Sequence, residues 1–249
     1  MLTYFHHVDP DDLRDNWERR LKHYAKMTGD GLAQKLVDRN AGWMQLAGND
    51  ALDLACMAYA FEDNPATVLA YTKSAAQHYA RAWDFEVLLA PSEFMLFLGL
   101  ALISSDTGFI TSLTNAPNKR FSDPDDPAPA AAYGLAEAAC RLAAGDAAKA
   151  TGLAAAAKAA AAKLNRFEAA EYAGLLLMVQ ALAAGDEALW KTACTQRRTD
   201  YIKLFSRPDY RQFPEALIDL RATSLARLAL RRAWAVPASV YIPELLLTS

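Results

Sequence analysis

Apolar residues recur at spacings of three and four along most of the chain, which is the period of a helix with one buried face. Two clear stripes are Leu13, Trp17, Leu21, Tyr24 and, further along, Val68, Thr72, Ala75, Tyr79, Trp83. No segment alternates apolar and polar residues over the length of a strand, and only the short run 236–241 has a β-like composition. The pattern therefore predicts an all-α protein of about ten helices.

Capping residues followed by proline mark the start of several helices. Asp9-Pro10 and Asn64-Pro65 each combine a capping side chain with a proline at the first helical position. Pro91 opens a further helix that carries the most apolar run of the chain, 94–103. Ten apolar residues are too few to span a bilayer, so this run predicts a buried core helix.

A short repeat organises the alanine-rich part of the chain. The sequence Leu-Ala-Ala-Gly-Asp occurs at 142–146 and again at 182–186, 40 residues later. Each copy is typical of a helix that ends at a glycine, followed by an aspartate that caps the next helix. We expect two helical hairpins, which pair 128–144 with 146–163 and 166–184 with 186–205. They fit an irregular helical-hairpin array or bundle, or alternatively an α-solenoid, for which three or more repeats are usual.

The prolines indicate one internal division. Residues 115–130 hold four of the eleven prolines and interrupt the helical pattern. We expect an N-terminal helical part over 1–114, a Pro/Asp-rich loop over 115–130 and a C-terminal helical-hairpin part over 131–249. We expect these parts to pack as one compact unit, which the length of the chain allows.

The segment 214–234 is predicted as one helix with an arginine on its apolar face. Arg221 lies in the middle of the stripe that contains Leu217 and Leu225. An arginine among leucines must be paired with a carboxylate or lie at the edge of the face. We expect Arg221 to form a structural ion pair that fixes helix packing. Recognition of a partner or ligand is the alternative.

Charge is distributed unevenly along the chain. Residues 1–130 carry 18 acidic and 11 basic residues, whereas 187–249 carry 6 acidic and 10 basic residues. The net charge of −3 argues against a nucleic-acid partner, because proteins that bind nucleic acids usually carry a basic surface. The densest acidic cluster is Asp123, Asp125 and Asp126, which predicts either a solvated loop or a contact surface for a basic partner.

Catalytic and metal-binding motifs are missing from the sequence. The four histidines lack the spacing of metal-binding helices, and the only G-x-G, at 29–31, lacks the third glycine of a dinucleotide-binding loop. Cys56, Cys140 and Cys194 are widely spaced, which indicates reduced core thiols. We expect no enzymatic activity, no cofactor and no metal. Because 1–12 contain no apolar secretory segment, we expect a cytoplasmic protein without a membrane partner.

The C-terminal region is similar to a known family. An arginine-containing helix over 225–232 is followed by an extended link and by the sequence Tyr-Ile-Pro-Glu-Leu-Leu at 241–246. This order resembles the end of the bacterial immunity protein family numbered forty-nine, found beside polymorphic toxins. The resemblance implies an antitoxin that binds a cognate toxin domain and neutralises it in the cytoplasm. It implies no particular interface residues.

An immunity protein is thus the leading hypothesis. A toxin domain that acts on nucleic acid is basic, so the acidic N-terminal half and the loop with Asp123, Asp125 and Asp126 are expected to face it. The rival arrangement is that the basic C-terminal segment binds an acidic partner. The alternative function is a helical-repeat scaffold that binds a peptide or protein in a concave groove.

Overall fold

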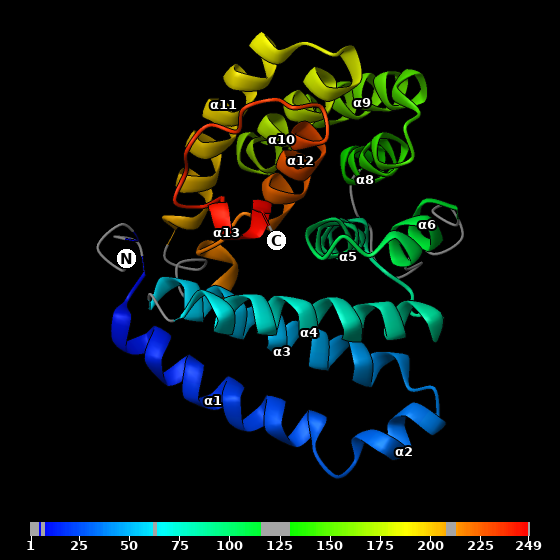
Figure 1. Ribbon diagram of the computed structural model, residues 1–249. Coiled ribbons are helices and arrows are strands. Elements are labelled where there is room, and N and C mark those ends of the chain that lie inside the picture. The colour runs from blue at the N-terminus through cyan, green and yellow to red at the C-terminus, as the bar shows by residue number, and fades with distance from the viewer. Residues whose placement is uncertain (1–4, 6–7, 62–63, 116–129, 208–212, 249) are drawn as a thin grey trace. The chain divides into compact units, whose positions relative to one another are not determined.

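The computed structural model describes residues 5, 8–61, 64–115, 130–207 and 213–248 (Figure 1). Over these residues the chain forms twelve α-helices and no strand, and ten of the helices have seven residues or more. The predicted all-α class with about ten helices is confirmed. The β-like run at 236–241 contributes only to an isolated bridge between Ser239 and Ile242.

Backbone contacts divide the chain into two compact units. Unit 1 contains Met1–Val87 and Phe205–Ile218, and unit 2 contains Leu88–Leu204 and Asp219–Thr248. The contacts therefore separate the chain after Val87, and not at the expected loop 115–130. Most of that loop, 116–129, lies outside the described residues.

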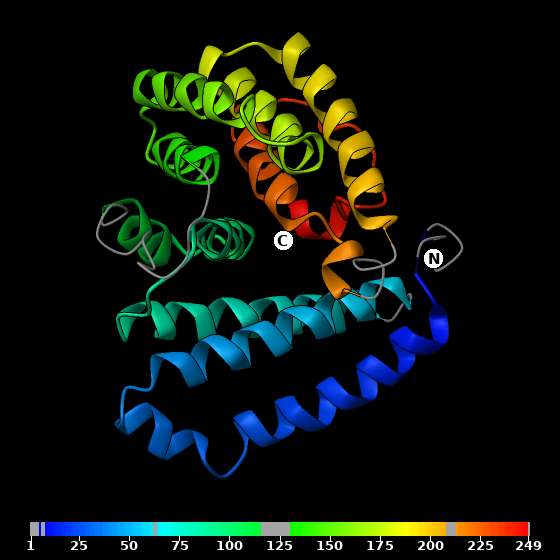
Figure 2. The same cartoon turned by 180° about the vertical axis from the view of Figure 1, so that it is seen from behind.

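Unit 1 is built from helices that begin where the capping residues predict. Its elements are α1 (Pro10–Thr28), α2 (Leu32–Val37), α3 (Ala41–Ala60), α4 (Pro65–Asp84) and the short 3-10 helix η2 (Pro214–Ala216). The Asp9 carboxylate accepts hydrogen bonds from the first turn of α1, and the Asn64 side chain caps α4 in the same way. Helix α3 packs against α1 and α4, as seen from behind in Figure 2, and its apolar side chains form the core of the unit.

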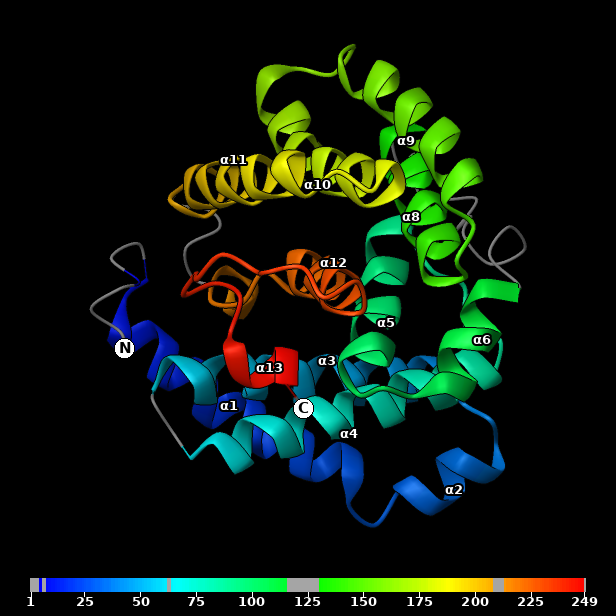
Figure 3. The same ribbon diagram turned by 45° about the horizontal axis from the view of Figure 1, so that its top comes forward.

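Unit 2 contains the two predicted hairpins. Its helices are α5 (Pro91–Ile103), α6 (Thr107–Asn115), α8 (Ala130–Ala143), α9 (Ala147–Ala161), α10 (Arg166–Ala184), α11 (Glu187–Phe205, whose last residue is counted with unit 1), α12 (Leu220–Leu230) and α13 (Glu244–Thr248). Helix α9 packs on both α8 and α10, so the successive hairpins stack (Figure 3). Helices α5 and α10 also contact α12.

The two copies of the repeat form equivalent turns. Gly145 and Gly185 have φ angles of +84° and +70°, a left-handed conformation that residues with a side chain rarely adopt. The aspartates that follow them accept hydrogen bonds from the next helices, at Lys149 N and Leu189 N respectively. These turns confirm the prediction from the repeat.

A buried ion pair joins α11 to the start of α12. Arg197 Nε lies 2.5 Å from Asp219 Oδ2, and the two side chains are only 4% and 3% exposed. The same guanidinium donates a second hydrogen bond to Asp219 and one to the carbonyl of Glu171 on α10. Gly174 makes this approach possible, because a Cβ atom there would lie 2.5 Å from the Arg197 Cα atom. One side chain thus connects three helices.

The same aspartate corrects the predicted helix over 214–234. Asp219 accepts a hydrogen bond from Ala222 N and is the N-cap of α12, while its own N–H donates to the Tyr241 carbonyl. The backbone before it is therefore not helical, and the segment divides into η2 and α12. Helix α12 also ends early, because Ala233 adopts a φ of +59° and Trp234 N bonds back to Ala229 O.

Arg221 lies on α12 beside a carboxylate of α10. Its Nη1 atom is 2.8 Å from Glu171 Oε1, and the arginine side chain is 22% exposed. The fully enclosed arginine of unit 2 is Arg197, which the sequence pattern did not single out. Glu171 contacts both arginines, through its carbonyl and its carboxylate.

Two helices of unit 2 are strongly apolar, which raises the question of whether either could span a membrane. Helix α5 carries the predicted apolar run and is buried along nearly all of it. Over the described residues, α10 is the one helix long and apolar enough to cross a bilayer by length and composition, and 44% of that stretch is buried inside the fold. Core helices of globular proteins share this character, so α10 is weak evidence for a membrane span.

The Arg197–Asp219 pair leads to a first prediction. Replacing Arg197 with Met leaves the Asp219 carboxylate buried without its counter-ion, which typically costs about 3–5 kcal/mol. We expect the free energy of unfolding of Arg197→Met to fall by about that amount in chemical denaturation. The neighbouring exposed arginine supplies the control, Arg198→Met, which should change stability by less than about 0.5 kcal/mol. Equal effects of the two substitutions would contradict a stabilising role for the buried pair.

Candidate functional site

The residues predicted to carry function are not brought together by the described structure. Asp123, Asp125 and Asp126 lie outside the described residues, and Arg221 pairs with Glu171 inside unit 2. The three cysteines are buried, and burial raises the pKa of Cys140 to about 11 and that of Cys194 to about 12. Thiols with such pKa values stay protonated at neutral pH, so they are poor nucleophiles.

A different set of polar residues meets between α1 and α3 in unit 1. Arg20 on α1 reaches two carboxylates one helical turn apart on α3. Its Nη1 atom lies 2.6 Å from Asp50 Oδ1, and its Nε atom lies 2.8 Å from Asp53 Oδ2. Asp50 is 1% exposed and Asp53 is 6% exposed, whereas the arginine side chain keeps contact with solvent. A single guanidinium is therefore shared between two buried carboxylates.

Asp50 has a second partner from the same face of α1. His23 lies one turn after Arg20, and its Nδ1 atom donates to Asp50 Oδ2. The imidazole is about half exposed. Both carboxylate oxygens of Asp50 therefore have hydrogen-bond partners on α1.

The environment of Asp53 disfavours the ionised form of its carboxyl group. Burial raises its pKa, and the negative charge of Glu215 on η2 raises it further; Arg20 lowers it only in part, so that the pKa of Asp53 rises to about 8. Helix η2 packs on α3, which brings Glu215 from a distant part of the sequence into this electrostatic environment. Asp50, Asp53 and Glu215 thus share one electrostatic environment with the Arg20 guanidinium.

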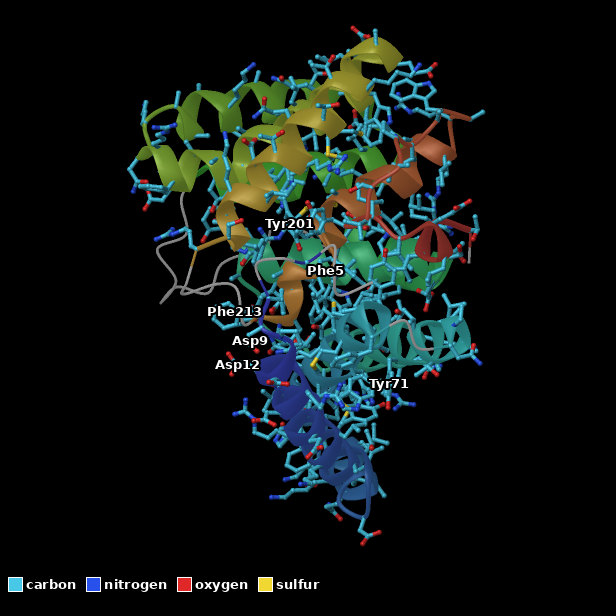
Figure 4. All side chains as sticks on the ribbon, turned by 90° about the vertical axis from the view of Figure 1, so that its left-hand side faces the viewer. Phe5, Asp9, Asp12, Tyr71, Tyr201 and Phe213 are labelled. Carbon is cyan, nitrogen blue, oxygen red and sulfur yellow. The ribbon has the colours of Figure 1, made fainter. Side chains whose placement is uncertain are left out.

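This cluster opens into a depression of about 940 Å³ on unit 1. Asp53, Arg20 and Glu215 contribute to its walls, together with side chains of the first half of α1. Its charged residues are five acids and three bases: Asp12, Asp15, Glu18, Asp53, Glu215, Arg19, Arg20 and Lys22. Phe213, which is 44% exposed, also lines it, and Figure 4 shows this ring and Asp12 on the same side of unit 1.

The arrangement of these side chains can hold a cationic group. His23 and Asp50 form a pair of the kind that orients a general base, yet none of their described contacts is to a serine or cysteine nucleophile. Within the described part of the chain, no group of three or more His, Cys, Asp or Glu side chains is arranged to hold a metal ion. An excess of partly buried carboxylate with an aromatic ring nearby is suited to receiving a cationic group.

Sequence reasoning missed this site, although a signal was present. Asp50 and Asp53 are the only charged residues of α3, and they stand in its most apolar half. Charged residues on a buried face require partners. Arg20 and His23 have the matching spacing on α1, so the pairing could have been proposed. Glu215 could not, since it is about 160 positions from Asp53 in the sequence.

Comparisons with models of protein families, with curated proteins and with solved structures gave no match to this chain.

The raised pKa of Asp53 leads to a prediction about stability and pH. Its folded pKa of about 8 exceeds its ordinary value of 3.8, so the native state binds this proton more tightly than the unfolded state. The contribution of Asp53 to stability is full below pH 4 and is lost as pH rises towards 8. Asp53→Asn removes this loss, so the variant should gain roughly 2–4 kcal/mol relative to the wild type between pH 5 and pH 9.

Urea unfolding of both proteins across that pH range measures the difference directly. Asp30→Asn, which changes an exposed acid of unit 1, is the matched control and should follow the wild type at every pH. If the Asp53→Asn and wild-type curves run parallel, Asp53 does not carry a raised pKa.

Proposed function

We propose that this chain binds another protein through the depression of unit 1, and that the partner is a basic toxin domain which it neutralises. The observation that carries the proposal is the excess of acids over bases that line the depression, five to three, with the buried Asp53 among them. An arginine or lysine inserted from a partner would add positive charge beside Asp53 and would favour its ionised form. Charge of this kind at the centre of an interface contributes strongly to the lifetime of a complex.

The surroundings of the cluster support a protein partner. The depression has both acidic and basic residues along α1, and such mixed charge favours one register of docking over others. Phe213 offers an exposed aromatic ring beside them, and aromatic residues are enriched among the residues that dominate binding energies. These features are more suited to a protein surface than to a small apolar ligand.

The C-terminal resemblance supports the choice of a toxin as the partner. The residues that carry it, 225–232 and 241–246, lie in α12 and the turn that follows it, at the bridge before α13 and in α13 itself. Most of them are buried in unit 2. The resemblance therefore concerns the core of the fold and leaves the binding surface to be argued separately. In this proposal the chain is cytoplasmic, bacterial and not an enzyme.

The stacked hairpins α8–α9 and α10–α11 favour a second candidate function. Arrays of helical hairpins commonly present extended surfaces to peptides or proteins. Under this scaffold hypothesis, binding would depend on residues of unit 2, and changes in the unit 1 depression would leave it unaffected.

The proposal can be tested with a partner captured from lysate of the native cell. The partner should contain an enzymatic domain whose activity is abolished by a stoichiometric amount of this chain. The double variant Asp53→Asn/Glu215→Gln should weaken the complex at least about tenfold, mainly through faster dissociation. The control Asp30→Asn/Asp38→Asn removes two exposed acids of unit 1 that do not line the depression, and should bind like the wild type. Equal affinities of the three proteins would contradict the assignment of the interface.

The acidic loop is tested separately through the rate of association. Charges at the edge of an interface act mainly on encounter, and this effect is screened by salt. If Asp123, Asp125 and Asp126 face a basic partner, changing all three to Asn should slow association at low salt and flatten its salt dependence. An association rate equal to that of the wild type at every salt concentration would show that the loop takes no part in binding.

A further inference from the structure

The repeated turns of unit 2 border a second, smaller cavity. The turns that follow α8 and α10 approach the C-terminal end of α12, and together they enclose a cleft of about 240 Å³. Leu142, Leu182 and Leu228, one from each helix, form an aliphatic floor. Pockets for drug-sized ligands usually occupy about 300–1,000 Å³, so this cleft fits a group no larger than about one residue.

Two consecutive arginines stand at the rim of this cleft. The guanidinium of Arg232 donates to the carbonyl of Leu182 and lies 5.5 Å from the centre of the Trp234 ring. These contacts hold Arg232 in place against the end of α10. The arginine is thus part of the wall and still presents a positive charge to the cavity.

Arg231 differs from its neighbour because its side chain is unpaired. It is exposed, and no residue in the described part of the chain forms a hydrogen bond or ion pair with its guanidinium. One turn earlier, Arg227 is turned towards the carbonyls of Leu102 and Leu247. Burial lowers the pKa of Arg227, and the charge of Arg231 lowers it further. Arg231 therefore places beside the cleft a positive charge that no contact within the described part of the chain neutralises.

We infer that this cleft binds the C-terminal residue of a partner polypeptide, provided that this residue has an aliphatic side chain. The side chain packs on the leucine floor, and the free guanidinium of Arg231, assisted by Arg232, donates hydrogen bonds to the terminal carboxylate. Arginine is suited to this task because its planar fork matches the two oxygens of a carboxylate. A C-terminal leucine combines an apolar group and a carboxylate within the space of one residue, which matches the cavity in both size and charge. This inference is independent of the function proposed for unit 1.

The experiment uses two probes that differ only in charge. They are the peptide acetyl-Gly-Gly-Leu with a free carboxylate and the same peptide with a C-terminal amide. Each is titrated into the 15N-labelled full chain and followed by NMR. We expect the free acid to shift the amide signals of Gly145 and Arg231, with a Kd on the order of millimolar for so small a ligand. The amide should bind about tenfold more weakly, because it loses the charge-assisted hydrogen bonds.

Substitutions locate the binding group. Arg231→Gln changes an exposed side chain and should fold normally, yet it should reduce the affinity for the free acid to that of the amide. Arg198→Gln removes an exposed arginine that does not line the cleft and should bind the acid like the wild type. Equal binding of acid and amide, an unchanged affinity of Arg231→Gln, or no shift at Gly145 and Arg231 would each overturn the inference.

Discussion

Buried carboxylates need counter-ions, and this constraint shapes both units of the protein. Each unit encloses a guanidinium–carboxylate contact that joins helices distant in the sequence. In unit 2 the contact is balanced: Arg197 pairs with Asp219, which in turn caps α12. In unit 1 the single guanidinium of Arg20 is shared by Asp50 and Asp53, and the charge of Glu215 helps to raise the pKa of Asp53. The balanced pair of unit 2 fixes helix packing. The cluster of unit 1 lies beside a depression lined by more acids than bases, where a cation from outside would lower the pKa of Asp53.

Much of the fold could be predicted from local signals, because helix ends are determined by a few neighbouring residues. Asp9, Asn64 and the two Leu-Ala-Ala-Gly-Asp turns each specify a backbone conformation within about five positions, and all four helix boundaries agree with the structure. The helix expected over 214–234 failed for a non-local reason. The N–H of Asp219 donates a hydrogen bond to the carbonyl of Tyr241, 22 positions later. The periodicity of residues 214–234 cannot indicate a contact with a residue outside that segment.

The candidate site was harder to predict from the sequence because its contacts are also non-local. The distribution of charge along the sequence indicates the loop with Asp123, Asp125 and Asp126, where acidic residues are close together in the chain. In the described cluster the charged residues come from α1, α3 and η2. They are far apart in the sequence but close together in the fold. The more informative signal was the presence of two isolated aspartates, Asp50 and Asp53, in an apolar helix, because a buried carboxylate requires a polar or charged partner. Arg231 shows the converse case, in which a charge near an apolar cleft has no partner in the described fold.

The account of unit 1 depends on one physical property, the affinity of Asp53 for its proton. The most direct measurement is an NMR titration of the side-chain carboxyl carbons in 13C-labelled protein, with the Asp53 signal assigned by its loss in Asp53→Asn. The account predicts that this carboxyl titrates near pH 8 in the free protein. Titration near the ordinary aspartate value of about 3.9 would mean that Arg20 already neutralises the cluster, and it would contradict the proposed site for a cationic partner group.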